Sequence, residues 1–509
     1  MIRAARNLAR LFTIARTLAR YDALFLMEKL PVARNAAFLA RLVSRRNVPG
    51  RPGERLADAL EALGPSFIKL GQALSIRPDL VGDDVADDLT GLQDRLPPFS
   101  SSEARRIIAD EMEKPVEALY DAFDDQPVAA ASIAQVHYAV TTAGHPVAVK
   151  VLRPNAESAI HRDLDLMYWV AGLIEHFAPA FRRLKPVETV RTFERSVTME
   201  MDLRFEAAAA QEMQENFLEN PEFRVPDVDW QRTSQRVLTT ERISGIPIDE
   251  AEQLREAGHD PQVVVRNAAA VFFAMVFRDG FFHADMHPGN LFVGPDGTLL
   301  AVDFGIMGRL DSRTRHYLAD MLIGFLQRDY RRVAEVHFKA GFVPADRSVD
   351  AFTQACRSIA EPVLGKPLAE ISIARLLGHL FHVTETFGME VQPHLLLLQK
   401  SMLLTEGVGR RLDPNVNMWE LARPLIEDWI AHNMGPMARM RETASETRDS
   451  LERLPRLAAK LEDTTDRLNQ GVPLHPDSVR ALTHRRTPMT VKLLWAAVAV
   501  LAVLVAFEV

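Results

Sequence analysis

The spacing of apolar residues predicts a largely helical chain with one β-rich segment. Helical periodicity runs from about residue 56 to 119, with breaks at two proline-containing pairs, Gly64-Pro65 and Pro97-Pro98. It returns over 155–220, and after Gln262 the chain is mostly helical to about residue 430. We see no internal repeat of fixed period, so a solenoid or propeller is not expected.

The β-rich segment has the pattern of a hairpin. Residues 127–140 and 146–152 are rich in apolar and β-branched side chains, and the polar stretch 141–145 between them is typical of a turn. Shorter strands are expected at 236–240, 290–293 and 299–302. The chain thus has a helical region, a short β-rich region and then a second helical region.

The N-terminus is strongly basic. Residues 1–51 contain ten arginines and one lysine but only two acidic side chains. On a helical wheel one broad sector holds Arg3, Arg6, Arg10, Arg16 and Arg20, and the other holds Leu8, Leu11, Phe12, Ala15 and Leu18. Such a helix can lie on an anionic membrane surface, or it can pack on its own domain. A transit peptide is a third interpretation, but no serine precedes Ser44.

The C-terminus is apolar. Residues 493–507 contain no polar side chain, and the run extends back to Met489 if Lys492 snorkels to the headgroups. Nineteen helical residues span about 28 Å, close to the roughly 30 Å hydrocarbon core, so we expect a single tail anchor rather than a buried helix. Basic residues at 484–486 precede it, which predicts that the body lies on the cytoplasmic side. Residues 436–488 are charged and helix-prone and are interpreted as a tether.

Composition narrows the classes of function. The chain has 509 residues, 47% apolar and 25% charged, which is typical of a globular protein with roughly two to four folding units. Its formal net charge of -8 gives no basic field for nucleic acid, so no nucleic-acid partner is expected. The single cysteine, Cys356, excludes an internal disulfide and a thiolate metal cluster.

Four residues follow the order of a kinase site. Asp285 and Asn290 lie five residues apart, Asp303-Phe304-Gly305 follows, and upstream Lys150 ends a predicted strand within Val-Ala-Val-Lys. In kinases the loop aspartate orients the nucleophile, the asparagine and second aspartate hold Mg²⁺, and the lysine meets the phosphates. Each motif alone is weak, but their order and spacing together predict ATP and Mg²⁺ as cofactors.

Other features of this region depart from ordinary protein kinases or argue against another metal. The phosphate-covering loop is Ala129-Ala130-Ala131-Ser132 instead of a glycine-rich loop, so nucleotide binding should be altered. A helical pattern begins at about Ser312, soon after Gly305, which leaves little room for a peptide-binding activation segment. Ala284 replaces the arginine that would pair with an activation-loop phosphate. His283 and His287 lack a third nitrogen or sulfur ligand nearby, so zinc is not expected.

These motifs make the chain resemble the UbiB family, atypical kinase-like proteins of ubiquinone biosynthesis, from near the N-terminus to about residue 430. The resemblance depends on a Lys-x-Gly-Gln signature, the alanine-rich loop, a Glu-x-Asp motif, the catalytic loop and Asp-Phe-Gly. In sequence order these are Lys69 to Gln72, Ala129 to His137, Glu200 to Asp202, Phe282 to Asn290 and Asp303 to Gly305.

The resemblance implies an α+β, bilobal protein-kinase-like fold with a helical N-terminal extension, a helix-rich C-lobe and a C-terminal hydrophobic helix. The implied parts are a membrane-surface segment (1–50), the helical extension (51–120), the N-lobe (121–245), the C-lobe (246–435), the tether (436–488) and the anchor (489–509). UbiB proteins carry two hydrophobic C-terminal segments and this chain shows one, so one or two membrane passes stay open.

The resemblance also assigns roles to site residues. Lys69 and Gln72 would lie over the nucleotide site and work with Glu200 and Asp202. Lys150 would meet the phosphates with Glu200 or Glu206 as its partner, and the sequence does not choose between them. The remaining roles are Asp285 as the catalytic aspartate, Asn290 and Asp303 as Mg²⁺ ligands, and the backbone of Glu241 to Ile243 as the adenine contact.

The implied activity is that of an atypical kinase or ATPase supporting ubiquinone production at the bacterial inner membrane. Its partners would be membrane lipid, polyprenylated quinone precursors and other ubiquinone-biosynthesis proteins. One alternative is a non-catalytic pseudokinase scaffold. Another is a component of 2-polyprenylphenol hydroxylation, but the chain has no Gly-x-Gly-x-x-Gly fingerprint and no metal cluster to support oxygen chemistry.

Overall fold

The computed structural model divides the chain into two units, Met1–Ile430 and Ala431–Val509. The structure describes residues 2–25, 48–75, 81–90, 92, 96–177, 186–362, 383–384, 386–389, 393–413, 421 and 424–425, all within the first unit. Among these residues no helix has both the length and the apolarity to cross a bilayer. The tether and the tail anchor expected at 436–488 and 489–509 lie outside the described residues.

Four helices near the N-terminus share one hydrophobic core. They are α1 (Ile2–Arg20), α4 (Pro52–Leu63), α5 (Pro65–Ser75) and α7 (Asp83–Thr90). The core contains Leu60, Ile68 and Leu89, which are almost fully buried. Gly64, between α4 and α5, has a φ of 102° that favours glycine, so the Gly-Pro break in the sequence is a sharp turn between two helices. This core places α5 against the rest of the unit.

Helix α1 is fastened to its own domain by two of its arginines. Arg6 Nη2 lies 2.7 Å from Asp165 Oδ2, and Arg10 Nε lies 2.8 Å from Asp163 Oδ1. Asp163 is almost fully buried, so Arg10 offsets the cost of burying that carboxylate. Arg16 and Arg20 stay exposed. The structure therefore shows the packed arrangement for Arg6 and Arg10, and membrane contact through the remaining face stays a prediction.

The first sheet is antiparallel and carries Lys150. Its strands run in the order β1-β3-β4-β6 with β2 beside β3, and α8 (Ser101–Met112) and α9 (Val116–Leu119) pack against it. The strands are β1 (Tyr120–Phe123), β2 (Ala129–Ala130), β3 (Ala134–Thr141), β4 (Pro146–Leu152) and β6 (Val237–Glu241). The predicted hairpin is confirmed: β3 pairs with β4, and the turn closes with Thr141 N–H donating to His145 O.

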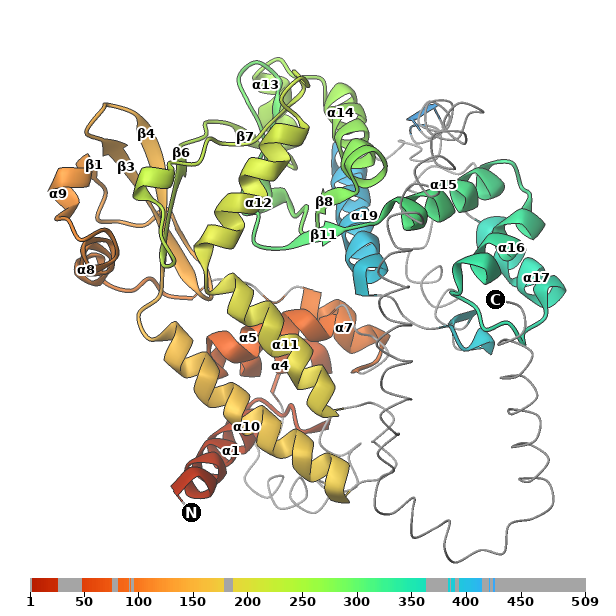
Figure 1. The fold of residues 1–509 in the computed structure, drawn as a ribbon, viewed down its shortest axis with the longest axis horizontal. Helices are drawn as coiled ribbons and strands as arrows, with labels where there is room; N and C mark the ends of the chain where they lie inside the picture. The colour runs from red at the N-terminus through yellow and green to blue at the C-terminus, as the bar shows by residue number, and fades with distance from the viewer. Residues whose placement is uncertain are drawn as a thin grey trace, which may run out of the picture. The chain divides into compact units, whose positions relative to one another are not determined.

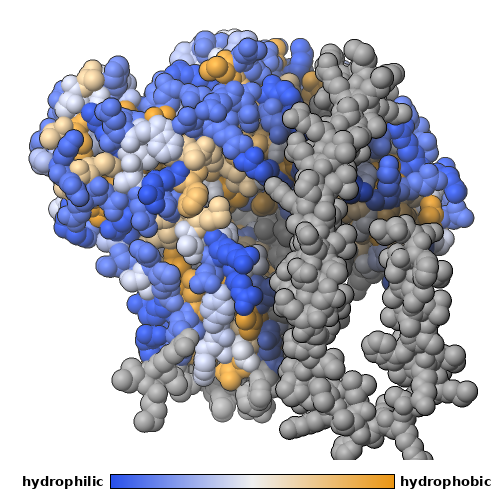
Figure 2. All heavy atoms as spheres, in the orientation of Figure 1, coloured by the Kyte–Doolittle hydropathy of each residue, from blue (hydrophilic) through white to orange (hydrophobic). Residues whose placement is uncertain are grey.

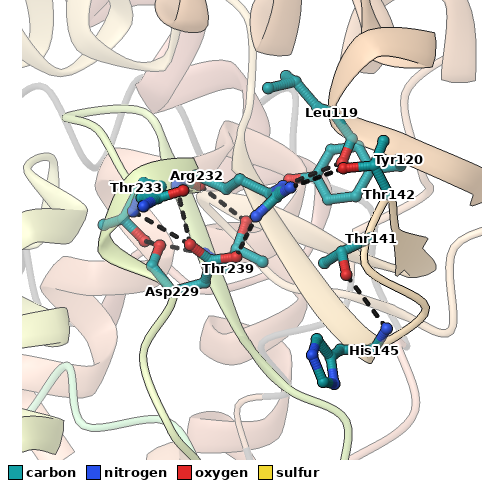
Figure 3. Close-up of polar contacts among 10 residues, drawn as sticks. Leu119, Tyr120, Thr141, Thr142, His145, Asp229, Arg232, Thr233 and Thr239 are labelled. Atoms are coloured by element: carbon teal, nitrogen blue, oxygen red, sulfur yellow. Dashed lines mark hydrogen bonds and ion pairs between the residues drawn. The ribbon is translucent and has the colours of Figure 1, made fainter.

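A polar network beside this sheet fixes the strand that leads to Glu241 (Figure 3). Arg232, in the 3₁₀ turn Trp230–Arg232, donates to Leu119 O and to the carboxylate of Asp229. Thr239 on β6 donates to Arg232 O and lies 2.9 Å from the buried Tyr120 hydroxyl. Burial raises the pKa of Tyr120 to about 12. The network joins β1, β6 and the 3₁₀ turn through satisfied buried groups.

Three helices connect the first sheet to the second half of the unit (Figure 1). They are α10 (Ala156–Phe177), α11 (Pro186–Glu200) and α12 (Leu203–Asn216). Helices α10 and α11 pack on each other, and both contact α5. Asp202 precedes α12 as its N-cap, and its side chain accepts from Arg204 N–H. The helical pattern expected over 155–220 is confirmed for the described residues.

The second half is helix-rich with short strands. Its strands form a four-stranded sheet in the order β5-β10-β9-β7 and a two-stranded sheet of β11 and β8. The strands are β5 (Phe223–Arg224), β7 (Ile246–Pro247), β8 (Phe281–His283), β9 (Leu291–Val293), β10 (Leu299–Ala301) and β11 (Met307–Arg309). The helices are α13 (Ala251–Glu256), α14 (Pro261–Phe273), the π-helical turn Ala274–Asp279, the 3₁₀ turn Pro288–Asn290, α15 (Ser312–Leu326), α16 (Tyr330–Ala340), α17 (Val349–Ala360) and α19 (Pro393–Leu412).

Helix α19 belongs to the core of this half. Leu398, Val408 and Leu412 are buried in the same cluster as Phe282 and Met286. Helix α19 contacts α14 and β11, beside β8 (Figure 1). Outside this core, hydrophilic side chains dominate the coloured part of the face drawn in Figure 2. A segment late in the sequence is thus built into the centre of the fold.

Candidate functional site

Lys150 lies between two carboxylates. Its Nζ is 2.8 Å from Glu206 Oε1, 2.9 Å from Glu206 Oε2 and 3.1 Å from Asp303 Oδ1. Lys150 extends from β4, Glu206 from the first turn of α12, and Asp303 follows β10. The pair with Glu206 is largely buried, whereas the Asp303 side chain is about half exposed. The ammonium therefore joins both halves of the fold at one point.

The three groups shift one another's titration. The Lys150 ammonium holds the pKa of Asp303 well below its usual range, although the partial desolvation of this half-exposed carboxylate acts in the opposite direction. Burial raises the pKa of Glu206 to about 7, against the attraction of Lys150. The two carboxylates raise the pKa of Lys150, although burial opposes them. Lys150 and Asp303 therefore stay charged at neutral pH, while Glu206 titrates there.

Asp303 has an uncommon backbone conformation. Its φ is +62°, in the left-handed region that few residues other than glycine adopt. Phe304 is buried against the His283 ring, with centroids 5.3 Å apart. A Cβ on Gly305 would lie 3.3 Å from Asp303 Oδ1, so this glycine lets the carboxylate fold back beside its own backbone. Such local strain is typical of functional sites.

Lys69 pairs with Glu200, so the structure separates the two carboxylates that the sequence left undecided. Lys69 Nζ lies 2.8 Å from Glu200 Oε2, and both side chains are nearly buried. Lys69 comes from α5 and Glu200 ends α11. The Lys69 charge also helps to lower the pKa of Asp303, which places α5 near the Lys150 cluster. Lys150 has Glu206 as its partner, and Lys69 has Glu200.

Asp202 and Gln72 contribute differently. Asp202 accepts from Arg204 Nε and Nη2 at 2.8 and 2.7 Å, and these bonds lower the pKa of its carboxyl group. Gln72 follows Lys69 on α5, and the backbone carbonyl of Gln72 accepts from the Ser75 hydroxyl. The carboxylate of Asp202 is thus oriented by Arg204 and by its N-cap bond. The predicted nucleotide roles of Asp202 and Gln72 stay predictions.

The loop between β8 and β9 is fixed by hydrogen bonds around Asp285. Asp285 N–H donates to His283 Nδ1, and Asn290 Nδ2 donates to Asp285 O at 3.0 Å. Because His283 Nδ1 accepts, its Nε2 carries the proton and donates to Val302 O at 3.2 Å. Burial lowers the pKa of His283, in agreement with this neutral form. The loop presents Asp285 with its backbone held on two sides.

The donors of this site suit Mg²⁺ held together with a nucleotide. Asn290 uses its amide nitrogen in the loop, so its Oδ1 remains as an acceptor, and the ionised Asp303 supplies a carboxylate. Val302 N–H donates to Asn290 O, which links the two ligand segments. In the described part of the chain, no group of three His, Cys, Asp or Glu side chains could hold a metal. Mg²⁺ typically takes one or two protein oxygens and completes its shell with phosphates and water.

Comparison with known proteins identifies two family models and several named relatives. The family model for the ABC1 atypical kinase-like domain matches residues 91–337, and that for the UbiB helical domain matches residues 356–417. "Probable protein kinase UbiB" of Marinobacter nauticus is 42% identical over 92% of this chain and 87% of the relative. The protein of the same name from Pseudomonas paraeruginosa is 41% identical over 91% and 88%.

The chain belongs to the UbiB family. Among solved structures, the complex of Rv3197 and erythromycin from Mycobacterium tuberculosis aligns with a TM-score of 0.51 and 25% identity, over 77% of this chain and 97% of that one. The expected α+β, atypical kinase-like fold is thereby confirmed for the described residues, while the C-terminal hydrophobic helix lies outside them.

The alanine-rich loop of this UbiB chain is closed by backbone pairing. Ala129 and Ala130 pair with β3, and Ala131 N–H donates to Ala134 O. Arg153 donates to Ala131 O from Nε and Nη2 and reaches Pro97 O from Nη1. Ser132 is fully buried. The loop is thus a fixed turn near Lys150, and it is anchored by Arg153, a residue that no sequence motif marks.

The residues after this loop are structural within the UbiB fold. His137 Nδ1 donates to Asp124 O, and its Nε2 therefore accepts from Gln135 Nε2 at 2.8 Å. Gln135 Oε1 accepts from Phe99 N–H. Burial lowers the pKa of His137, as a neutral ring requires. These bonds tie the segment before α8 to the sheet.

The predicted adenine contact follows β6. Glu241 N–H donates to Asp227 O, and the Glu241 carboxylate pairs with Arg224 Nη2. Ile243 is partly buried two residues further on. The assignment of the backbone of Glu241 to Ile243 to adenine stays a prediction.

Sequence reasoning missed Lys400, which the UbiB helical domain contributes. Its Nζ lies 2.8 Å from Asp285 Oδ1. The only sequence signal is a lysine two residues after the apolar run Leu395 to Leu398. The contact could not be found from spacing, because α19 is remote from Asp285 in the chain.

Proposed function

We propose that this UbiB-family chain binds ATP with Mg²⁺ and acts as an atypical kinase or ATPase in ubiquinone biosynthesis. The observation that carries the proposal is the convergence of Lys150, Glu206 and Asp303 within 3.1 Å contacts. A charged lysine and an ionised aspartate at one point are suited to a metal-bound polyphosphate. When bound, Mg²⁺ would neutralise charge that develops on the phosphates.

Each residue of the chain has a distinct task in this proposal. Lys150 contacts the phosphates, and Glu206 holds its ammonium in place. Asp303 and Asn290 are the Mg²⁺ ligands, and Asp285 orients the attacking hydroxyl or water and accepts its proton. The Lys69 and Glu200 pair on α5 and α11 closes the site beside them.

The short connection after Asp303 supports a small or lipid acceptor over a peptide. Strand β11 and helix α15 follow at once, and Asp311 caps α15 by accepting from Thr314 N–H. Only residues 306–311, which include β11, separate Gly305 from α15, and this leaves little room for a bound peptide. We propose that a polyprenylated quinone precursor is the acceptor, or that ATP hydrolysis itself is the useful step, at the cytoplasmic face of the bacterial inner membrane. Other ubiquinone-biosynthesis proteins are the proposed partners.

A specific observation favours a second candidate, a nucleotide-dependent scaffold without catalysis. The turn at Ala131 is fixed by backbone pairing and by Arg153, so it cannot wrap phosphates as a glycine-rich loop does. In this alternative, nucleotide binding alone sets the conformation that partner proteins recognise.

Binding, turnover and complementation distinguish the candidates. Purified protein in lipid should bind Mg-ATP, and Asp303→Asn should abolish turnover, while Asp296→Asn in the exposed β9–β10 turn should not. Absence of nucleotide binding by the parent protein would refute both candidates. An Asp285→Asn variant that binds ATP, hydrolyses none and still restores quinone synthesis in a deletion strain would favour the scaffold.

A further inference from the structure

The carboxylate of Asp285 has an ionic partner on a helix remote in sequence. Lys400 Nζ on α19 lies 2.8 Å from Asp285 Oδ1. Both side chains are about seven-tenths buried, so solvent screens this contact less than it screens an ordinary surface pair. The remaining exposure leaves the pair open on one side.

The position of Lys400 is set by the core and not by the ion pair. The neighbouring Ser401 is fully buried, and its hydroxyl lies within hydrogen-bonding distance of His283 O (3.2 Å) and Leu397 O (3.0 Å). Leu398 packs in the cluster that contains Phe282 and Met286. Lys400 is therefore carried to Asp285 on a helix that also contacts the backbone at the end of β8, directly before the loop, and the geometry is preorganised.

The loop has no permanent cation of its own. Between Asp285 and Asn290 the sequence is Met-His-Pro-Gly, without lysine or arginine. Lys150 and Lys69 are each engaged with other carboxylates. A positive charge beside Asp285 thus comes from α19, in the region matched by the UbiB helical domain.

We propose that Lys400 is a positioning residue for the reaction at Asp285, a proposal that rests on the proposed function. Its ammonium fixes the rotamer of the Asp285 carboxylate and keeps one oxygen occupied, so that the other oxygen meets the attacking hydroxyl or water. Through this contact the helical domain completes the kinase-like site. A displacement of α19 would release Asp285 and lower turnover without removing the nucleotide.

The test compares Lys400→Gln, Lys400→Arg and the control Lys114→Gln in the full chain in lipid, with thermal unfolding measured for each. Lys114 is an exposed lysine after α8, far from the loop in the sequence. Lys400→Gln should lower kcat about a hundredfold, the typical effect of a misplaced catalytic group. The KM for Mg-ATP should stay within about threefold, because Lys150 and Asp303 are untouched. Lys400→Arg should retain at least about a tenth of the kcat of the parent protein.

Two results would overturn the proposal. One is a kcat for Lys400→Gln within about twofold of Lys114→Gln, and the other is loss of kcat and nucleotide affinity in equal proportion. If Lys400→Gln does not fold, Lys400→Met takes its place in the same comparison. If the parent protein shows no turnover, the proposed enzymatic activity is refuted on its own. The role of Lys400 is then tested by whether each variant restores quinone synthesis in a deletion strain. Restoration of quinone synthesis by Lys400→Arg but not by Lys400→Gln supports the positioning role of Lys400, and full restoration by Lys400→Gln refutes it.

Discussion

Lys150 Nζ lies 2.8 and 2.9 Å from the two carboxylate oxygens of Glu206, and Glu200 is paired elsewhere. Glu206 lies in the first turn of α12, whereas Glu200 ends α11. The turn between the two helices therefore sends neighbouring glutamates to different lysines. Two separate charge pairs join α5, α11, α12 and β4 around one site.

The first prediction concerns Glu206 and pH. Because burial raises its pKa to about 7, Glu206 is largely ionised at pH 8 and largely protonated at pH 6. Glu206→Gln should weaken Mg-ATP binding about tenfold at pH 8, and the difference should shrink to within about threefold at pH 6. Titration calorimetry at both pH values measures this. An equal loss in Glu200→Gln that shrinks in the same way would contradict the assigned pairing.

A second prediction concerns the Lys69 and Glu200 pair. Both side chains are only 10–12% exposed, so removal of one partner leaves a nearly buried charge. A double-mutant cycle with Lys69→Met and Glu200→Gln should give a coupling free energy of about 1 to 3 kcal/mol in denaturant unfolding. The same cycle on the exposed Arg331 and Glu335 pair of α16 should give a much smaller coupling. Equal couplings would show that burial does not strengthen the Lys69 pair.

A third prediction concerns the alanine loop. Ala130 pairs with Gln135 in the sheet, so glycine at this position should loosen the turn without removing a side-chain contact of the nucleotide. We expect Ala130→Gly to change the ratio of ATP to ADP affinity. Fluorescent-nucleotide displacement with both ligands tests this. Unchanged affinities for both would mean that the alanines serve packing alone.

A fourth prediction follows from the partly buried His337, because desolvation lowers the pKa of its ring below the usual 6.5. The unfolded chain takes up the proton near pH 6.5 and the folded chain only at lower pH. The contribution of the neutral ring to stability is therefore present above about pH 6.5 and is lost as the pH falls towards the folded pKa. His337→Phe keeps a ring beside Phe342 and Phe352 but loses the hydrogen bond from Nδ1 to Val333 O.

Thermal unfolding of His337→Phe and of the parent protein tests this pH dependence of stability. At pH 8 the variant should be less stable by about 1 kcal/mol, the usual value of one hydrogen bond. At pH 5 the difference in stability between the parent protein and the variant should be smaller, because only the parent protein loses stability through protonation of His337. A gap that is constant or widens towards pH 5 would argue that His337 is protonated in the folded protein.

A fifth prediction uses Cys356 on α17. It is the chain's single cysteine, and burial raises the pKa of its thiol to about 12. The thiolate is the reactive form, so an aromatic disulfide reagent at pH 8 should modify the native protein very slowly. After unfolding in denaturant, one thiol per chain should react within minutes. Rapid reaction of the native protein would indicate that α17 opens locally.

The core elements of the fold could be predicted from local patterns. The hairpin of β3 and β4, the long helices over 155–220 and the start of α15 at Ser312 agree with the apolar spacing and turn residues. Strands β8 and β11 were not predicted, because three-residue strands carry too little alternation to be recognised. Their pairing depends on contacts between Phe282 and Gly308 that only the folded chain provides.

For the site, the chemical groups and their order can be recognised from sequence motifs alone: Lys150, Asp285, Asn290 and Asp303 occur with the spacing of a kinase site. Which of these charges form pairs is evident only in the folded chain. The fold pairs Lys150 with Glu206, Lys69 with Glu200 and Lys400 with Asp285. The physical reason is that an ion pair depends on distance and burial in space, and each of these lysines comes from an element remote in the chain from its carboxylate.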